Sequence, residues 1–96
     1  MDDRPTAIFT GSDEIAAGIT IEAKEKGLNI PKDLAVVGFD DQPIAEILDP
    51  KLTTIRQPVD QMGQKSVEIM IAMLENPEMI VKSYELPIDL IVRQST

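Results

Sequence analysis

The stretch from Ala35 to Pro58 reads AVVGFDDQPIAEILDPKLTTIRQP, and it decides how this chain folds. The near-continuous apolar run from Leu34 to Phe39 predicts a strand covered on both faces, as in a parallel sheet. Asp40 and Asp41 follow that strand directly. In alternating α/β sheets, ligands bind beyond the carboxyl ends of the strands. These two acids are therefore candidate ligand contacts.

A short helix and a second strand follow the two acids. Pro43 fits the first turn of a helix, where its missing N–H is tolerated, and Asp49-Pro50 closes that helix. We expect Asp41 to cap it, because Asp is a favoured N-cap residue. The segment Leu52 to Arg56 predicts a strand that Pro58 ends.

The first third of the chain predicts a strand and a helix. Ala7 to Phe9 is a short apolar strand, and the helix extends from Ser12 to about Lys26. Ser12 is a suitable N-cap, and Asp13 with Glu14 suits the positive end of the helix dipole. Gly27 is the residue expected just beyond the helix. Strand, helix and strand in this order predict a parallel βαβ unit.

The last third predicts a long helix and a closing strand. Asp60 can cap a helix that extends to about Glu75, where Asn76-Pro77 stops it. Tyr84 to Arg93 is rich in Leu, Ile and Val and predicts a strand near a sheet edge, because it contains Pro87. The whole pattern predicts one small α/β domain with a parallel sheet.

Composition excludes several classes of function. The chain has 96 residues, with 9 Lys plus Arg against 17 Asp plus Glu, so its net charge is −8. Binding to a phosphate backbone depends on Lys and Arg, so nucleic-acid binding by this segment is disfavoured. The absence of Cys and His excludes disulfides and the usual zinc sites, and no cofactor is indicated. The segment MDDRPTAIF is not a signal peptide, and no apolar run has the length of a membrane span. We expect a cytoplasmic protein.

The first helix has two apolar stripes. The face expected toward the sheet comprises Ile15, Ala16, Ile19 and Ala23. A narrower stripe on the far side comprises Ala17, Thr20, Ile21 and Lys24. Single apolar residues on a surface are normal, but a stripe of small residues is also typical of a helix packing face.

The helix from Asp60 to Glu75 is apolar over more than half its circumference. A core helix is the simplest interpretation, but a chain this small has no second layer to cover so wide a face. Each large side chain left exposed forfeits roughly 1.5–3 kcal/mol. We therefore expect this helix to be buried against something outside these residues. Its apolar side chains are Met62, Val67, Ile69, Met70, Ile71, Met73 and Leu74.

The segments Gly11-Ser12-Asp13 and Asp40-Asp41 follow two strands that parallel topology brings to one edge. An ionised Asp40 accepts hydrogen bonds at two oxygens, which suits the vicinal hydroxyls of a sugar. The alternative is that Asp40 is only a solvated turn residue. A small acid-dependent enzyme is a further alternative, but we assign no catalytic residue. Ser12 has no His to activate it, and the glycines lack the spacing of a phosphate-binding loop.

Three segments of the chain resemble the carboxyl-terminal part of the LacI/GalR family of bacterial transcriptional repressors. They are RPTAIFTGSDEIAAG, KGLNIPKDLAVVGFDD and DPKLTTIRQPVDQMGQKSVEIM, and the resemblance extends over Arg4 to Thr96. It implies an αβα segment of a periplasmic binding protein-like type I fold, truncated and without its DNA-binding domain. Residues 1–56 would then lie mainly in the carboxyl-terminal lobe, 57–80 would form a crossover and a helix packed on the other lobe, and 81–96 would form the closing strand.

The resemblance also implies a function and its residues. The chain would be the effector-sensing and dimerisation segment of a LacI-type regulator of carbohydrate or related metabolism. A segment of a periplasmic-type sugar-binding protein is the alternative. The implied effector contacts are Asp40, Ser12 and Asp13, with Ser12 replacing a longer Asn. The implied dimer interface comprises Ala17, Thr20, Ile21, Lys24, Ile44, Ile47 and Leu48.

The implied partners are a small-molecule effector, such as a sugar or sugar phosphate, and a second copy of the chain. Operator DNA would be contacted only through the amino-terminal domain, so the fragment alone would not bind it.

Overall fold

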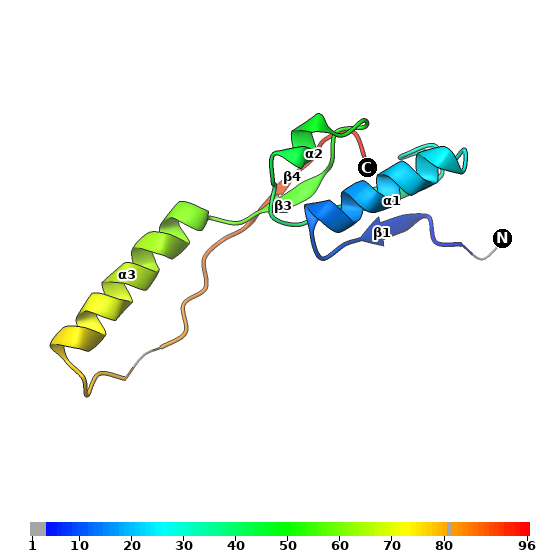
Figure 1. Ribbon diagram of the computed structural model, residues 1–96. Helices are drawn as coiled ribbons and strands as arrows, with labels where there is room; N and C mark the ends of the chain where they lie inside the picture. Colours follow the sequence, from blue (N-terminus) through cyan, green and yellow to red (C-terminus); the bar gives the residue numbers. More distant parts are fainter. Residues whose placement is uncertain (1–3, 81) are drawn as a thin grey trace. The chain divides into compact units, whose positions relative to one another are not determined.

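The computed structural model describes residues 4–80 and 82–96, which fall into two compact units (Figure 1). Unit 1 is Met1–Arg56 together with Asp89–Thr96, and unit 2 is Gln57–Ile88. The chain therefore leaves unit 1 after Arg56 and returns to it at Asp89.

The first half of unit 1 is a parallel βαβ element, as the sequence predicts. Strands β1 (Ala7–Phe9) and β2 (Ala35–Val37) pair in parallel, and helix α1 (Asp13–Glu25) connects them. The Oγ atom of Ser12 accepts a hydrogen bond from the Ile15 N–H at 3.1 Å, so the predicted N-cap is confirmed. Gly27 follows the helix with a φ of 79°, a conformation that glycine adopts without strain.

The sheet continues beyond β2 through a third strand. Strand β3 (Thr54–Arg56) begins beside the end of β2, where Val37 and Thr53 form an isolated parallel bridge. Strand β4 (Asp89–Ile91) then pairs antiparallel with β3. The predicted strand from Tyr84 to Arg93 is thus too long, because β3 offers pairing partners to three residues only.

Neither of the two predicted Asp caps forms. Helix α2 (Ile44–Ile47) begins after Pro43, and helix α3 (Val59–Glu75) begins after Pro58, each without a side-chain cap. Asp60 lies inside the first turn of α3, where it still suits the helix dipole. The carboxylate of Asp41 binds two arginines instead, as described below.

The core of unit 1 is small and lies between α1, α2 and the sheet. Its buried members are Ala16, Leu34, Val36, Ala45 and Leu52, and the half-buried side chains packed around them are Ile8, Ile19, Ile30 and Leu48. Alanines supply the helical side of this core, so both helices can approach the sheet closely.

The predicted faces of α1 are partly wrong. The sequence predicts that Ala17 and Thr20 lie on an outer stripe, but these residues are only 5% and 2% exposed. It predicts Ile15 in the core, but this residue is 55% exposed. The reason is that α1 contacts α2 as well as β2, so its buried face is turned toward Ala17 and Thr20.

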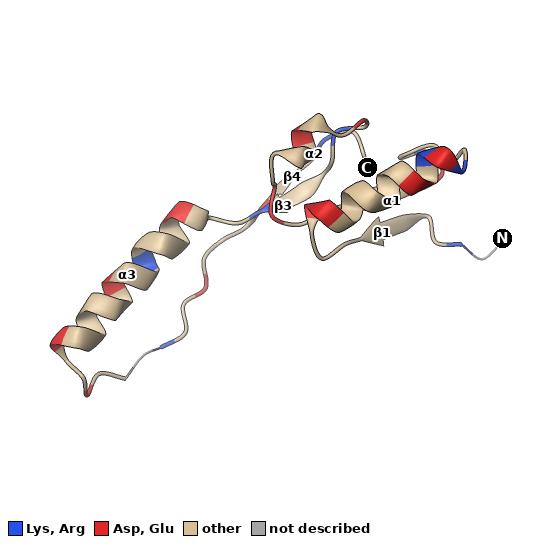
Figure 2. Cartoon of the chain, viewed as in Figure 1, with Lys and Arg blue, Asp and Glu red and all other residues tan. Residues whose placement is uncertain are grey.

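Unit 2 contains α3 and the extended segment that follows it, and α3 has no buried residue. Charged positions are spaced singly along this helix (Figure 2). Ile69 is half-buried, but the other large apolar side chains of α3 remain between 40% and 74% exposed, as expected for a chain without a second layer. These side chains are Val59, Met62, Val67, Met70, Ile71, Met73 and Leu74. In residues 4–80 and 82–96, no helix is long and apolar enough to span a membrane.

The end of the chain is anchored between β2 and the start of β3. The Val36 N–H donates to the Ser95 carbonyl at 2.9 Å, and the Thr53 N–H donates to Ser95 Oγ at 2.8 Å. Ser95 is only 1% exposed. Its hydrogen bonds satisfy backbone groups that would otherwise be buried without partners.

Asp41 joins the two points at which the chain leaves and re-enters unit 1. Its Oδ2 accepts from Arg56 Nε and its Oδ1 from Arg93 Nη2, both at 2.7 Å. Arg93 also donates to the Leu52 carbonyl at 2.8 Å. Burial alone would raise the pKa of Asp41, but the hydrogen bonds and charges of Arg93 and Arg56 lower that pKa below its ordinary value. We call these three residues the arginine clamp.

Replacing Asp41 by Asn tests the arginine clamp. Asn tolerates the positive φ of this position, so the loss should come from the charge and not from the backbone. We expect the free energy of unfolding at neutral pH to fall by about 1–3 kcal/mol. Because the folded pKa is lowered, this contribution exists above the unfolded pKa of about 4 and is lost as the pH falls through the lower folded value. Urea unfolding from pH 7 to pH 3 should therefore show the two proteins converging.

The matched control for the clamp is Glu22→Gln, which removes a fully exposed pairing with Lys26. This variant should unfold like the wild type at neutral pH, since exposed ion pairs contribute little. An Asp41→Asn deficit that persists unchanged at pH 3 would contradict the assignment.

Gly38 is closely packed at the end of β2. A Cβ atom at this position would overlap with Asp13 Oδ1 and lie 2.8 Å from Leu52 Cδ2. Gly38→Ala should lower the free energy of unfolding by about 1–3 kcal/mol, because these neighbours are themselves buried and must shift. Gly18→Ala is the control, since no atom lies within 4 Å of the place that its new methyl group would occupy, and alanine favours a helix interior by about 0.5–1 kcal/mol. Thermal unfolding should move in opposite directions for the two variants, and equal shifts would refute the close packing.

Candidate functional site

The two strand ends that carry the predicted contacts lie side by side. The Thr10 N–H donates to the Val37 carbonyl at 2.9 Å, and the Asp13 N–H donates to the Phe39 carbonyl at 3.1 Å. The pairing of β1 with β2 therefore continues past both strands. It brings Ser12 and Asp13 next to the turn that holds Asp40, and we call these three residues the strand-end site.

Asp40 occupies an unusual backbone conformation in this site. Its φ is 104° and that of Asp41 is 54°, and they are the only non-glycine residues with positive φ in the part of the chain described. The Asp40 N–H donates to the Ile55 carbonyl at 2.8 Å, which fixes the turn to β3. A strained residue of this kind costs on the order of 1–3 kcal/mol, and such residues cluster at binding sites. The side chain of Asp40 is exposed at the edge of the sheet.

Ser12 serves the helix and still has hydrogen-bonding capacity. Its Oγ atom accepts the Ile15 N–H, while its carbonyl accepts from Thr10 Oγ1 at 2.8 Å. A hydroxyl has one donor and two acceptor positions, so Ser12 can donate to a ligand while it caps α1.

Asp13 lies inside the fold, beneath the other two residues. It has no exposed surface, and each of its carboxylate oxygens accepts a protein donor. The Gln42 N–H binds Oδ2 and the Thr54 hydroxyl binds Oδ1, both at 2.6 Å. Asp13 therefore lies near Ser12 and Asp40, but its oxygens are turned into the protein and not toward the edge where Asp40 is exposed.

Sequence reasoning missed two residues that shape this site. Gly38 provides the space for the Asp13 carboxylate, and a glycine inside an apolar strand pattern is a signal of such close approach. Thr54 is fully buried and supplies the second donor to Asp13. Nothing in the local sequence marks Thr54, because its role depends on the placement of β3 beside β2.

The residues predicted to form a dimer interface differ in exposure. Ile21 and Ile47 are 54% and 78% exposed, and Lys24 is exposed and forms an ion pair with Asp49 at 3.4 Å. Ile44 and Leu48 are half-buried, whereas Ala17 and Thr20 are buried within unit 1. The accessible part of the predicted interface is therefore Ile21, Lys24 and Ile47, which we call the α1/α2 face.

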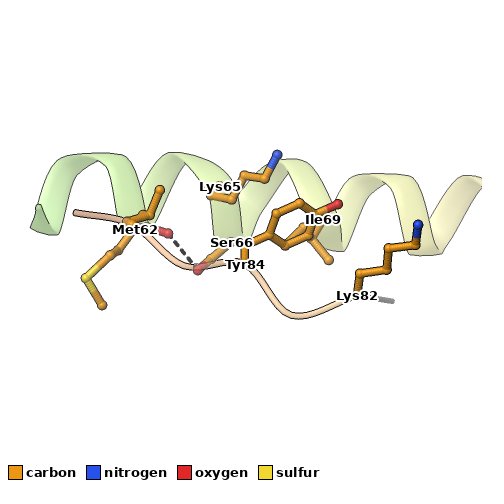
Figure 3. Close-up of a pocket in the computed structure, with 7 residues that line it drawn as sticks. Met62, Lys65, Ser66, Ile69, Lys82 and Tyr84 are labelled. Carbon is orange, nitrogen blue, oxygen red and sulfur yellow. Dashed lines mark hydrogen bonds between the residues drawn. The ribbon is translucent and has the colours of Figure 1, made fainter. Parts of the chain in front are cut away.

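A hollow of about 250 Å³ lies in unit 2, beside α3. In Figure 3, Tyr84 from the extended segment lies across α3, and the ammonium group of Lys65 is 4.3 Å from the centre of its ring. The hydroxyl of Ser66 in this hollow donates to the Met62 carbonyl at 2.7 Å. None of the predicted effector contacts lines this hollow, whose walls are Met62, Lys65, Ser66, Ile69, Lys82, Tyr84 and Leu86.

The strand-end site offers hydrogen bonding and negative charge. An exposed carboxylate, a serine hydroxyl and nearby backbone groups are suited to recognising hydroxyl-bearing molecules. Among the described residues, no group of three or more acidic side chains is placed to hold a metal ion.

Comparison with known proteins identifies the family. The family model of the periplasmic binding protein-like domain matches residues 1–96. The NTD biosynthesis operon regulator NtdR of Bacillus subtilis is 44% identical over 97 residues, which cover 100% of this chain and 30% of that protein. The chain therefore spans about 30% of the length of this curated relative.

Solved structures agree with this result. A LacI family transcriptional regulator from Enterococcus faecium with bound ribose has a TM-score of 0.85 and 35% identity, covering 99% of this chain and 35% of that one. The lac repressor dimer bound to operator and the anti-inducer ONPF has a TM-score of 0.86 and 34% identity, covering 96% of this chain and 32% of that one. The chain belongs to the periplasmic binding protein-like domain family, and its relatives are LacI-family transcriptional regulators.

Proposed function

We propose that this chain forms one side of the effector-binding cleft of a LacI-family transcriptional regulator, and that the effector is a sugar or a related polyhydroxylated molecule. The relatives support this proposal, since one is a regulator with bound ribose and another is the lac repressor with its operator. With a net charge of −8, the chain itself is not the operator-binding part.

The observation that carries the proposal is the φ of 104° at Asp40. Glycine would adopt this conformation with little strain, yet the position holds an aspartate. A carboxylate kept in a strained turn at the carboxyl end of a strand is best explained by the ligand it binds. Its two oxygens match a pair of vicinal hydroxyls, and the neighbouring Ser12 hydroxyl adds one donor.

The mechanism we propose is a shift between conformations. An effector held by Asp40 on one side and by the remainder of the protein on the other favours one arrangement of the two sides. That preference becomes a coupling free energy between effector and operator binding. In this mechanism Asp40 and Ser12 bind and orient the effector, and neither forms a covalent bond with it.

A catalytic function is disfavoured by the same residues. Without His or Cys in the sequence, Ser12 has no base to activate it, and its oxygen already caps α1. The relatives are transcriptional regulators, which agrees with a binding role.

We also propose that two copies pair through the α1/α2 face. Ile21 and Ile47 are large apolar side chains that the chain leaves more than half exposed. Lys24 and Asp49, which belong to α1 and to the residues just after α2, form an ion pair and supply charged groups on the same two segments. An apolar centre with charged residues at its edge is the usual composition of a protein interface.

Asp40→Asn and Asp40→Gly separate the two properties of this residue. Both variants should weaken the binding of D-ribose or D-glucose to the intact protein by about 10–100-fold, because a charge-assisted hydrogen bond contributes about 1.5–3 kcal/mol. Asp40→Gly should in addition raise the free energy of unfolding, since it relieves the strain at this position. Isothermal titration calorimetry and urea unfolding measure the two effects.

Asp33→Asn is the control for Asp40, because its carboxylate accepts the Asn29 N–H in the turn after α1. This variant should bind sugar like the wild type. If Asp40→Asn kept full affinity, or if the wild type bound neither sugar, the assignment of Asp40 as a sugar contact would be wrong.

Ile47→Asp tests the α1/α2 face. An aspartate at the centre of an interface removes apolar burial of roughly 1.5–3 kcal/mol and adds an unpaired charge, so the dissociation constant of the dimer should rise at least about tenfold. Light scattering over a dilution series measures this shift in the intact protein. Ile80→Asp is the matched control, since Ile80 is 85% exposed and lies in unit 2. Equal dissociation of the two variants, or of neither, would exclude the α1/α2 face as the interface.

A further inference from the structure

The carboxylate of Asp13 is buried, and no basic side chain of residues 4–80 and 82–96 pairs with it. It has no exposed surface, and both donors that it binds are neutral groups, the Gln42 N–H and the Thr54 hydroxyl. Its position in the first turn of α1 adds the positive end of the helix dipole. Burying a charge is unfavourable unless hydrogen bonds compensate for it. Packing alone therefore does not account for an aspartate at this position.

What Asp13 binds is the turn that presents Asp40. Gln42 comes directly after Asp40 and Asp41, the two residues with positive φ. The Gln42 N–H points into the protein and ends on Asp13 Oδ2 at 2.6 Å. An acceptor in this place fixes the end of the turn, because a buried N–H without a partner is costly.

Thr54 connects the Asp13 carboxylate to Asp41, the middle residue of the turn. Its hydroxyl donates to Asp13 Oδ1 at 2.6 Å and accepts a long contact from the Asp41 N–H at 3.4 Å. The Asp13 acceptor therefore orients the Thr54 oxygen lone pairs toward the turn. On the other side of the carboxylate, only a glycine at position 38 leaves room, because a Cβ atom there would overlap with Asp13 Oδ1.

We propose that Asp13 is a positioning residue, whose buried carboxylate holds the Asp40–Gln42 turn in its strained conformation and so presents the Asp40 carboxylate to the effector. This role rests on the proposed function for its consequence, but the hold on the turn exists without any ligand. Asp13 acts through Asp40 and does not touch the effector.

The first arm of the test needs no ligand. Asp13→Asn replaces the carboxylate by an amide, which has only one acceptor oxygen for the two donors. Thr54→Val removes one of these donors while keeping the shape of the side chain. In the intact protein, both variants should speed hydrogen–deuterium exchange in the Asp40–Gln42 turn by about tenfold, while the Val36 amide bonded to Ser95 remains protected. Thr54→Ser retains the hydroxyl and should exchange like the wild type.

The second arm measures D-ribose affinity in a double-mutant cycle. Asp13→Asn should weaken binding about tenfold in the wild type and have little further effect when Asp40→Asn is already present, since it acts only through that carboxylate. Additive losses in the cycle would overturn the positioning role, as would an unchanged exchange rate in the turn for both Asp13→Asn and Thr54→Val.

The two arms also separate this inference from the proposed function. If neither D-ribose nor D-glucose bound, or if Asp40→Asn bound sugar normally, the proposed function would fail, but the exchange measurement would still decide whether Asp13 holds the turn. Faster exchange throughout unit 1 would show a loss of the whole fold and would overturn the local role for that variant. Thr54→Val, the milder change, then decides the question alone.

Discussion

Unit 1 depends on one buried charge, the carboxylate of Asp13. Asp13 is the first residue of α1, and its carboxylate accepts hydrogen bonds from Gln42 in the turn after β2 and from Thr54 at the start of β3. Three segments that are distant in sequence therefore meet at a single group. A neutral apolar residue could fill the same space, but it could not satisfy two inward-pointing donors at once.

Asp40 and Asp41 are consecutive but have different roles, because Asp41 belongs to the arginine clamp. Asp40 is exposed at the strand-end edge, whereas the Asp41 side chain is only 9% exposed and binds Arg56 and Arg93. The two consecutive acids thus lie in two environments, one exposed at the edge of the sheet and one against the strands that connect to unit 2. Both residues have positive φ.

The elements of the fold could be predicted well from the sequence, and their contacts less well. The capped helix α1, the parallel pairing of β1 with β2, and the meeting of Ser12 and Asp13 with the turn of Asp40 follow from local signals and from the topology of parallel strands. The direction in which α1 turns its faces could not be predicted, because α1 contacts α2 as well as β2, and α2 is a single turn of helix that is placed by tertiary packing. The cap expected from Asp41 failed because two arginines offered stronger partners than a helix N-terminus. The cap expected from Asp60 failed because α3 begins after Pro58, so Asp60 lies inside its first turn. The role of Thr54 has no local signal at all.

The exposure of α3 has a consequence for the order in which the chain unfolds. A helix of 17 residues with no buried side chain depends on its own backbone hydrogen bonds and on the few contacts of the Tyr84 segment. Most of the stability of a helix in a protein comes from tertiary packing of its apolar face, and α3 buries no such face in this chain. Unit 1, by contrast, has a closed core and an anchored chain end. The free energy for opening α3 locally is therefore much smaller than that for opening the strand-end site. In this chain the two units form separate cooperative elements, and α3 unfolds first when heat or denaturant is applied.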